Sequence, residues 1–494
     1  MNQYQLNILD FGADLTGEKT STIAIQKAID EASKIGGGEV IFPYGKIKTG
    51  TFNVYSNITL KFMNGSEIIA SESQKDYSDT CLIKIKNAKN FKIEGKGIIN
   101  GNFTKFLKYN EEAAIWIPNG FPDRNENYAW DNIHQQAEFF KPKLLIIEEC
   151  ENFTVQNITL KDSPFWTFHL IDCQNGVIHD VSVAGGVKEN HIINSDGIDI
   201  DSSSSIRISD CFVQSSDDGI CLKITKDSKK KECKDIIVSN CIVKSDESAI
   251  KIGSESYGSF KNIIFSNCTI NHAGAGLAFF MRDGGIIEDV IVNNLNMNLD
   301  PGTGGTPLYI WSGLRTSDTK HGRIKNILIS NVIGQAACGG YISGLEDGFI
   351  EDIDISNYHM DIHAEPDVLL HGRPVELIDK TDDLQKSPPC PFPVWSMKFA
   401  PYDLFIRYVK NIKMNNVNLS WVGKKEIKHL LRLKGIHDIF SNGLYFNSKY
   451  KGLSKNMINL TNVENAQLSN WYNGNNKINE SSINIKNCKE INIC

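Results

Sequence analysis

Three aspartates in the stretch Asn194–Ile224 have the side-chain type and the spacing that acid–base chemistry needs. Asp196 opens one Asp-Gly pair, and Asp217 and Asp218 precede the glycine of a second pair, twenty-one residues later. If each coil of the fold consumes about that many residues, the two turns lie side by side, about 4.8 Å apart. Carboxylates crowded at that distance can differ in protonation, so a general acid and a general base can coexist at one pH. We therefore predict an acid–base site here.

Two further aspartates, Asp199 and Asp201, lie between these turns, and their spacing indicates a structural role. They alternate with isoleucines, as side chains do along a strand that keeps one face in the core. We therefore expect both carboxylates to face solvent. Asp-Gly pairs also make ordinary turns, which would explain one isolated pair, whereas three aspartates in two adjacent coils favour a functional site.

The scaffold around these residues is a repeated phrase. From Val40 onward, short β-branched runs are divided by Gly, Asn, Asp and Ser, and a strand-turn-strand phrase recurs, as in NFTVQNITL at 152–160 and NIIFSNCTI at 262–270. Such a phrase, with insertions at one point of the coil, is typical of a solenoid. Each copy places an Asn or Asp at a corner, where it tolerates the left-handed conformation and can hydrogen-bond to its equivalent one coil above. The corner residues are Asn157, Asp180, Asp210, Asn240, Asn267, Asn294, Asn331, Asn357 and Asn416.

These repeats predict an all-β fold, a right-handed single-stranded parallel β-helix over residues 40–494. Leucine-rich repeats are the rival solenoid, but their Leu-x-x-Leu-x-Leu phrase is missing. Two long interruptions, at 101–143 and 361–403, predict loops that wall or cover a cleft. Loops that close one end of a cleft would favour attack on the ends of a polymer.

Residues 1–39 predict a short N-terminal cap on this β-helix. An extended run, NILDFGAD, is followed by an amphipathic helix over Ser21–Lys34, and glycines at 36–38 end the helical pattern. Because the core of a stacked-coil fold must be shielded from water at its ends, we expect this helix to cover one end. The apolar residues at helical spacing are Ile25, Ala28, Ile29 and Ala32.

The composition excludes several classes of partner. The chain has 52 Lys and Arg against 59 Asp and Glu, a net charge of -7, and no basic block, so we expect neither a nucleic-acid nor a membrane partner. Residues 1–11 hold no apolar run behind basic residues, and no apolar run approaches eighteen residues, so we expect neither a signal peptide nor a membrane span. This predicts a cytoplasmic protein; the alternative is a secreted or periplasmic protein whose signal peptide was removed.

The sequence contains twelve cysteines, none of them in a Cys-x-x-Cys motif. Cys211, Cys241 and Cys268 occupy equivalent points of successive repeats. A metal or disulfide set is one interpretation, but free cysteine is among the most buried residue types. We therefore expect these side chains to stack in the core, and we predict no metal and no cofactor.

The two Asp segments, at 194–197 and 217–219, resemble those of glycoside hydrolase family 28, the polygalacturonase and rhamnogalacturonan hydrolase family. The resemblance covers nearly the whole chain and includes FGAD, KPKLLIIEECENFTVQNITLKDSPFWTFHL and PYDLFIRYVKNI. It implies an oligosaccharide or polysaccharide substrate and a role in the degradation of pectin, a cell-wall polymer.

Carried over to this sequence, the resemblance implies that Asp217 is the general acid that protonates the glycosidic oxygen. Asp196 and Asp218 would position and deprotonate the attacking water, and Asn194, two residues before Asp196, would bind substrate. This is the inverting arrangement, in which the two carboxyl groups lie about 6.5 to 9.5 Å apart to leave room for the water.

The sequence departs from the family pattern beyond the acids. Polygalacturonases carry a Gly-His-Gly loop where this chain has Glu-Ser-Ala at 247–249, so the histidine is absent. They also carry an Arg-x-Lys pair, which grips the uronate carboxylate, where this chain has Ala278, Phe279 and Phe280. An apolar surface at Phe280 suits a sugar without a carboxylate, such as rhamnose.

Five other side chains near the acids are candidates for binding substrate. Lys223, Lys251 and Arg282 could each hold a carboxylate on the non-reducing side of the cut, or could be solvated charges on the coil surface. Trp166 and His169, in SPFWTFHL one coil earlier, could stack against or hydrogen-bond to the sugar, or the tryptophan could lie in the core.

The resulting hypothesis is an inverting, exo-acting hydrolase of α-linked galacturonate bonds in pectic oligosaccharides, with a neutral sugar such as rhamnose on the leaving-group side. Three alternatives stay open: the same chemistry on another neutral or sulfated glycan, a calcium-dependent pectate lyase, and a β-helix that binds carbohydrate without cleaving it. The lyases share the fold but abstract a proton with a basic residue. The sequence does not indicate an oligomeric state.

Overall fold

The computed structural model of the protein describes residues 4–109, 135–137, 141–185, 194–299, 305–316, 318–346, 348, 350–363, 368–370, 373–377, 398–399, 404–422, 429–448 and 457–494. None of the helices in these ranges is long and apolar enough to cross a membrane. The chain forms two compact units. Unit 1 comprises Met1–Leu222 with Asp227–Ser245, and unit 2 comprises Lys223–Lys226 with Asp246–Cys494.

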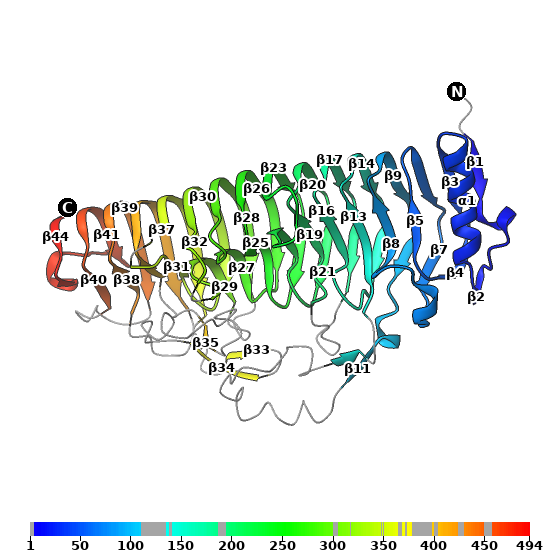
Figure 1. Ribbon diagram of the computed structural model, residues 1–494. Helices are drawn as coiled ribbons and strands as arrows, with labels where there is room; N and C mark the ends of the chain where they lie inside the picture. Colours follow the sequence, from blue (N-terminus) through cyan, green and yellow to red (C-terminus); the bar gives the residue numbers. More distant parts are fainter. Residues whose placement is uncertain are drawn as a thin grey trace. The chain divides into compact units, whose positions relative to one another are not determined.

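The predicted helix is present at the N-terminal end of unit 1 (Figure 1). α1 (Thr22–Lys34) starts one residue later than expected and ends at the predicted residue, ahead of Gly36 and Gly37, which have left-handed φ angles of 91° and 130°. Its apolar stripe is buried, and the helix packs against β1 (Gln5–Asn7), β3 (Gly38–Phe42) and β5 (Phe52–Val54). The helix therefore covers the first coils, as the cap was predicted to do.

The expected extended conformation of NILDFGAD is wrong in part. Residues Ile8–Phe11 form a 3-10 turn, η1, that follows β1. The Asn7 side chain accepts a hydrogen bond from the Leu9 backbone N–H at 3.0 Å, and this cap starts the turn. Asn is a favoured cap residue because its short side chain reaches backbone N–H groups that have no partner of their own.

Each coil of unit 1 contributes three short parallel strands, and each strand pairs with its equivalent in the next coil. The row whose strands follow the aspartate turns is called the site row below. The site row contains β5, β8 (Cys81–Lys86), β13 (Lys143–Glu148), β16 (Phe168–Ile171), β19 (Ile198–Asp201) and β22 (Ile220–Ile224). The second row contains β1, β3, β6 (Ile58–Phe62), β9 (Lys89–Gly95), β14 (Glu151–Gln156), β17 (Gln174–His179), β20 (Ser204–Ser209) and β23 (Glu232–Ser239). The third row contains β2 (Thr16–Thr20), β4 (Gly45–Thr49), β7 (Ser66–Ala70), β10 (Ile98–Asn100), β15 (Thr159–Lys161), β18 (Ser182–Ala184), β21 (Phe212–Ser215) and β24 (Ile242–Ser245).

Each coil of unit 2 contributes two strands, one of them long enough to run through the asparagine corner without a break. Its site row contains β25 (Ser248–Ser256), β27 (Ala275–Met281), β29 (Thr306–Ser312), β31 (Gly340–Ser343), β36 (Leu404–Arg407), β38 (Leu431–Lys434), β40 (Ile458–Thr461) and β43 (Asn484–Lys486). The long strands are β26 (Ser259–Asn271), β28 (Ile286–Asn298), β30 (Arg323–Ala336), β32 (Ile350–Ile362), β37 (Val409–Trp421), β39 (His437–Ser448), β41 (Glu464–Asn473) and the shorter β44 (Lys489–Ile493). Each unit is thus a right-handed parallel β-helix, and the predicted fold class is confirmed.

The remaining elements are short. Of the predicted loops at 101–143 and 361–403, only their ends and a few strand segments are among the described residues; the rest lie outside them. The short elements are η2 (Gln74–Asp76), η3 (Phe103–Lys105), β11 (Leu107–Tyr109), β12 (Gln135–Ala137), β33 (Val368–Leu370), β34 (Arg373–Leu377), β35 (Lys398–Phe399), β42 (Asn476–Lys477) and η8 (Glu480–Ser482).

The asparagine corners adopt the predicted conformation. All nine corner residues have φ between 49° and 58°, in the left-handed region. Neighbouring corners hydrogen-bond through their side chains, for example Asn294 Nδ2 to Asn267 Oδ1 at 3.0 Å and Asn416 Nδ2 to Asn357 Oδ1 at 2.8 Å. The ladder prediction is therefore confirmed, and it fixes the register in which the coils stack.

The core consists of stacked apolar side chains at equivalent positions. The rings of Phe91 and Phe153 lie parallel at 5.3 Å, and Gly176 follows them in the next coil. A Cβ atom on that glycine would lie 2.3 Å from the Phe153 ring, so the glycine makes room for the aromatic pair. Cys211, Cys241 and Cys268 are all buried, which confirms the prediction that they are core residues.

Candidate functional site

The three catalytic candidates of the sequence converge in unit 1. One carboxylate oxygen of each of Asp196, Asp217 and Asp218 lies within 4.8 Å of those of the other two. All three side chains are buried, with exposed fractions of 2, 7 and 3 %. The carboxylates are brought together because the two turns lie directly against each other and two of the acids are adjacent residues; the expected separation of about 6.5 to 9.5 Å refers to whole carboxyl groups and stays a prediction.

Backbone contacts hold the two Asp-Gly turns together. The Gly197 N–H donates to the Asp218 carbonyl at 2.8 Å, and the Ile198 N–H donates to the Gly219 carbonyl at 2.9 Å. A Cβ atom on Gly197 would lie only 2.5 Å from the Gly219 carbonyl oxygen. The glycine at this position is therefore required by close approach, and the approach brings the carboxylates together.

Hydrogen bonds from the backbone orient the Asp217 carboxylate. Its Oδ2 accepts from the Asn194 N–H at 3.0 Å, and its Oδ1 accepts from the Asp218 N–H at 2.9 Å. Asn194 has φ 60°, a left-handed conformation that asparagine adopts readily. Asn194 thus contacts the acids through its backbone N–H, a group that every residue except proline carries, and its expected role in binding substrate stays a prediction.

Two serines that sequence reasoning missed support the same turn. Ser215 Oγ donates to the Asp217 carbonyl at 2.8 Å, and Ser245 Oγ donates to the same carbonyl at 2.6 Å. Ser215 and Ser245 are partners in the pairing of β21 with β24. Both serines occupy the same point of successive repeats, just before acidic residues. This pattern in the sequence could have predicted their role.

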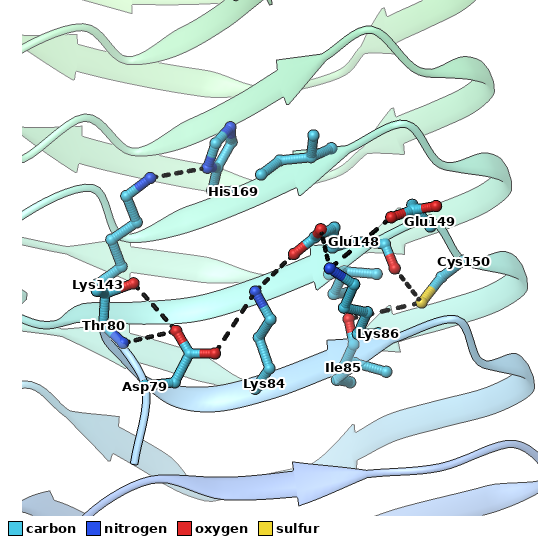
Figure 2. A network of polar contacts seen from close by, with 12 residues as sticks. Asp79, Thr80, Lys84, Ile85, Lys86, Lys143, Glu148, Glu149, Cys150 and His169 are labelled. Carbon is cyan, nitrogen blue, oxygen red and sulfur yellow. Dashed lines mark hydrogen bonds and ion pairs between the residues drawn. The ribbon is translucent and has the colours of Figure 1, made fainter. Parts of the chain in front are cut away.

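The coil before the acids holds the predicted tryptophan and histidine. Trp166 is only partly buried, so the alternative of a core tryptophan is wrong. His169 is 2 % exposed and lies edge-on to the Trp166 ring, with ring centroids 4.8 Å apart. The Lys143 ammonium, which the sequence reasoning also missed, lies 4.1 Å from the Trp166 ring centroid and 3.1 Å from His169 Nδ1. Figure 2 shows Lys143 and His169 turned toward each other from neighbouring strands.

The expectation that Asp199 and Asp201 face solvent is wrong. Both are fully buried, although they point away from the core of the coil. Asp201 accepts a hydrogen bond from Ser202 Oγ at 2.9 Å, and its other oxygen lies 3.5 Å from His169 Nε2. Alternation along a strand predicts which face a side chain takes, but neighbouring side chains decide whether that face meets water.

Unit 2 contains the predicted cations, and they are buried rather than solvated. Lys223, Lys251 and Arg282 have exposed fractions of 3, 5 and 1 %, so the alternative of solvated surface charges is wrong. Burial alone would raise the pKa of Glu255, but the positive charges of Lys223, Arg315 and Lys251 outweigh it and lower that pKa. Lys223 and Lys251 thus belong to one charge cluster around Glu255.

A second carboxylate anchors the arginine of this cluster. Arg315 makes a two-pronged ion pair with Asp283, with Nε–Oδ1 at 2.6 Å and Nη2–Oδ2 at 2.8 Å. Burial would raise the pKa of Asp283, and the hydrogen bonds from Arg315 and the Ser256 backbone lower it instead. Two-pronged pairs are among the strongest charge-assisted hydrogen bonds, so they fix the position of the guanidinium.

The apolar candidate Phe280 also lies in unit 2. Its ring contacts Tyr309 edge-on at 5.1 Å and Trp311 edge-on at 6.2 Å, and the Lys251 ammonium lies 5.7 Å from its centroid. Ala278 lies on the same face of β27, whereas Phe279 points into the core against Phe265. Arg282 stacks over Trp311 at 5.7 Å. A buried aromatic cluster with cations at its edge therefore stands where the sequence predicted an apolar surface.

The donor set of the aspartate cluster could also hold a divalent cation. Asp196, Asp217 and Asp218 each offer one carboxylate oxygen, and hard cations such as Ca²⁺ prefer oxygen ligands. Calcium takes six to eight such ligands, so water or substrate would have to supply the others. The cluster can thus serve either proton transfer or a metal ion, and the two uses call for different chemistry.

Comparison with known proteins identifies relatives of the chain. The sequence model described as "Glycosyl hydrolases family 28" matches residues 38–298, just over half of the chain. A probable polygalacturonase of Vitis vinifera is 26% identical over 307 residues, which cover 60% of this chain and 61% of that protein. A probable rhamnogalacturonase E of Aspergillus oryzae is 33% identical over 90 residues, 18% of this chain and 20% of that protein. The matched segments thus span less than two thirds of these curated relatives.

The fold is also similar to that of solved structures. An exopolygalacturonase from Thermotoga maritima superposes with a TM-score of 0.57 at 21% sequence identity, covering 74% of this chain and 88% of that one. At this level of identity the similarity concerns the β-helix alone.

Proposed function

The chain belongs to glycosyl hydrolases family 28, and on that basis we propose that it is a glycosidase acting on α-linked galacturonate bonds in pectic oligosaccharides. The observation that carries the proposal is the convergence of three buried carboxylates within 4.8 Å in the turns before β19 and β22. Carboxylates this close repel one another when all are ionised, and a retained proton relieves that repulsion. A cluster of this kind can donate a proton and accept one in the same reaction.

The roles follow from the contacts of each acid. Asp217 is held by two backbone N–H groups, and each of its oxygens has a second lone pair that can carry a proton. That proton passes to the glycosidic oxygen as the bond to the anomeric carbon breaks, so the leaving sugar departs as a neutral alcohol. Asp196 and Asp218 bind a water molecule and take one of its protons while its oxygen attacks the anomeric carbon.

The configuration of the product depends on which group attacks the anomeric carbon. Attack by water in a single step inverts the anomeric carbon, and inverting enzymes usually separate their carboxyl groups by about 6.5 to 9.5 Å. Retaining enzymes separate theirs by only about 5 to 5.5 Å. We propose inversion because three acids are available, so one pair can hold water while the third protonates. NMR of the first-formed product anomer tests this, and a retained configuration would contradict it.

For the leaving-group side we propose a neutral sugar such as rhamnose and attack from the chain end. Where polygalacturonases carry an Arg-x-Lys pair, this chain has Ala278 and Phe280, and the Phe280 ring belongs to an aromatic cluster with Tyr309 and Trp311. The similarity to a protein named as a rhamnogalacturonase supports the sugar, and the fold shared with an exopolygalacturonase is compatible with exo attack. A rapid loss of polymer viscosity before monosaccharide appears would instead indicate endo cleavage.

A screen tests the reaction class directly. Wild-type protein and the Asp217→Asn variant would be incubated with oligogalacturonates, alternating galacturonate–rhamnose oligosaccharides and neutral or sulfated α-linked glycans, with products identified by mass spectrometry. The proposal expects hydrolysis products, heavier by one water in sum, from a pectic substrate and none from the variant. Cleavage of neutral or sulfated glycans alone would contradict the proposed pectic substrate and assign the enzyme to another substrate class.

A calcium-dependent pectate lyase is the second candidate, because the aspartate cluster has the oxygen ligands that calcium prefers. Such an enzyme would release an unsaturated product that absorbs ultraviolet light, and a chelator would abolish the reaction. Hydrolysis that continues in the presence of chelator, with no change in ultraviolet absorbance, excludes this candidate.

A further inference from the structure

Two serines at the ends of neighbouring strands hydrogen-bond to one peptide unit of the second Asp-Gly turn. Ser215 is the last residue of β21, Ser245 is the last residue of β24, and the two residues are partners in the pairing of these strands. Ser215 Oγ donates to the Asp217 carbonyl at 2.8 Å, and Ser245 Oγ donates to the same oxygen at 2.6 Å. Because a carbonyl oxygen has two lone pairs, it can accept from both hydroxyls at once.

The other side of this peptide unit contacts the proposed acid. The Asp218 N–H belongs to the same peptide as the Asp217 carbonyl, and it donates to Asp217 Oδ1 at 2.9 Å. A trans peptide unit is planar, and its C=O and N–H bonds point in opposite directions. The serines therefore determine where this N–H points. A rotation of the peptide that broke their hydrogen bonds would also turn the N–H away from the carboxylate.

The two hydroxyls come from a regular part of the chain. β21 and β24 pair along their whole length, from Phe212 with Ile242 to Ser215 with Ser245. Ser215 and Ser245 are only 3 and 1 % exposed. In such an interior a hydrogen bond is electrostatically stronger than in water. The paired strand ends thus supply fixed donors to a turn that lies beyond the regular pairing.

Ser215 also links this peptide to the first Asp-Gly turn. Its Oγ lies 3.0 Å from the Asp218 carbonyl, which accepts from the Gly197 N–H at 2.8 Å. A hydroxyl has one proton, which it shares between two acceptors or gives to one of them. Ser215 therefore contacts two consecutive peptides of the turn, while Ser245 approaches the first of them from the next coil.

We infer that Ser215 and Ser245 are positioning residues for the proposed reaction. By holding the peptide between Asp217 and Asp218, they keep its N–H aimed at the Asp217 carboxylate and so fix the direction in which that carboxylate delivers its proton. The inference rests on the proposed function for the role of Asp217, and the serines act through that residue. The competing role is structural, in which the serines only satisfy a buried carbonyl and stabilise the turn.

Steady-state kinetics test the positioning role. Wild-type protein, Ser215→Ala, Ser245→Ala and the double variant would be assayed on an oligogalacturonate and on an alternating galacturonate–rhamnose oligosaccharide. Each single substitution removes one of two donors, so we expect kcat to fall roughly 3- to 10-fold and KM to change less than about two-fold. The double variant releases the peptide, and since a displacement of about 1 Å can cost about 10²-fold in rate, its kcat should fall by about that factor. Ser245→Thr keeps the hydroxyl, so its kcat should lie closer to wild type than to Ser245→Ala.

Ser203→Ala is the matched control. Ser203 is fully buried, and its Oγ donates to the Asp201 carbonyl at 2.8 Å and accepts from the Cys173 N–H at 3.0 Å. The control should lower the melting temperature at least as much as Ser245→Ala does and leave kcat unchanged. A kcat that falls no further in the Ser215 and Ser245 variants than in Ser203→Ala would assign the serines a structural role and overturn the inference. A rise in KM without a fall in kcat would overturn it as well.

Hydrogen exchange of the Asp218 amide distinguishes this inference from the proposed reaction, because it does not require turnover. Mass spectrometry with fragmentation would follow this amide in the full-length variants. We expect it to exchange about 10-fold faster or more in the double variant, and at the wild-type rate in Ser203→Ala. An unchanged rate in the double variant overturns the inference, whichever substrate the protein cleaves. Faster exchange, in a protein whose wild type hydrolyses no pectic substrate, would reject the proposed reaction and keep the role of the serines in orienting the carboxylate.

Discussion

The site rows of the two units share one architecture and differ in the way their charges are arranged. In unit 1 the turns before β19 and β22 crowd like charges, with three aspartate carboxylates within 4.8 Å. In unit 2 charges of opposite sign lie together, because Glu255 lies among two lysines and an arginine and Asp283 pairs with Arg315. Opposite charges attract one another, whereas like charges at close range repel one another and commonly mark sites of chemistry. Under the proposed function, the difference distinguishes the acid–base cluster of unit 1 from the paired charges of unit 2.

The largest expected effect is on the unit 1 side of this comparison. Asp217→Asn removes the proposed acid and preserves the shape of the side chain, so kcat should fall about 10²- to 10⁴-fold on a substrate with an unactivated leaving group. Asp210→Asn is the matched control, since Asp210 is a corner residue at φ 58° where most other coils already carry asparagine. Initial rates and far-ultraviolet circular dichroism would be measured for both variants. Near wild-type turnover in Asp217→Asn would remove Asp217 from the mechanism.

The second largest expected effect tests whether catalysis requires the close approach of the two Asp-Gly turns. Gly197→Ala places a methyl group 2.5 Å from the Gly219 carbonyl oxygen, so the two turns must move apart. Displacement of catalytic groups by about 1 Å can cost about 10²-fold in rate, and we expect a loss of that order in kcat together with a lower melting temperature. Gly185→Ala is the control, because the nearest atom to its added methyl group lies 3.8 Å away. Unchanged kinetics in Gly197→Ala would show that the close approach of the turns is dispensable.

A smaller effect, on substrate preference, concerns the aromatic cluster around Phe280 in unit 2. Under the proposed function, a galacturonate on the leaving-group side would place its charge against the aromatic cluster around Phe280, and desolvating a charge without a partner is costly. A rhamnose methyl group there would contribute about 0.8 kcal/mol. We therefore expect kcat/KM on an alternating galacturonate–rhamnose oligosaccharide to exceed that on an oligogalacturonate of equal length by roughly 10-fold. The reverse preference would mean that a cation such as Lys251 or Arg282 binds the leaving uronate.

The smallest effect tests the role of paired charges in unit 2. The folded protein lowers the pKa of Glu255 below its ordinary value of 4.5 because of Lys223, Arg315 and Lys251, despite the opposing effect of burial. The ionised carboxylate therefore stabilises the folded state above about pH 4.5, and this contribution is lost as the pH falls from there through the lowered pKa. Glu255→Gln should lower the melting temperature at neutral pH and flatten its dependence on pH below 4.5.

Glu232→Gln is the control for this last experiment, because Glu232 pairs with Lys234 at the surface, where ion pairs contribute little. A melting temperature that responds equally to both substitutions would show that the cluster around Glu255 is no more stabilising than an exposed pair.

Features whose cause is local were predictable from the sequence. Asparagine at a corner, such as Asn294, tolerates a left-handed φ in any context, and the helix at Thr22–Lys34 follows from apolar spacing alone. The convergence of Asp196 and Asp217 also followed, because a spacing close to one coil length places equivalent turns next to each other. In these cases the number of residues between two positions determines their geometry.

Features that depend on neighbouring coils were decided only by the tertiary structure. Alternation gave the correct face for Asp201, but the burial of that face by His169 and Ser202 does not follow from alternation. The position of the Lys143 ammonium over the Trp166 ring depends on how many residues the insertion before Lys143 adds to its coil. The number of residues along the chain therefore does not predict this contact. In a solenoid, each coil determines which way its side chains point, and the coils stacked against it determine whether those side chains meet water, a partner or a substrate.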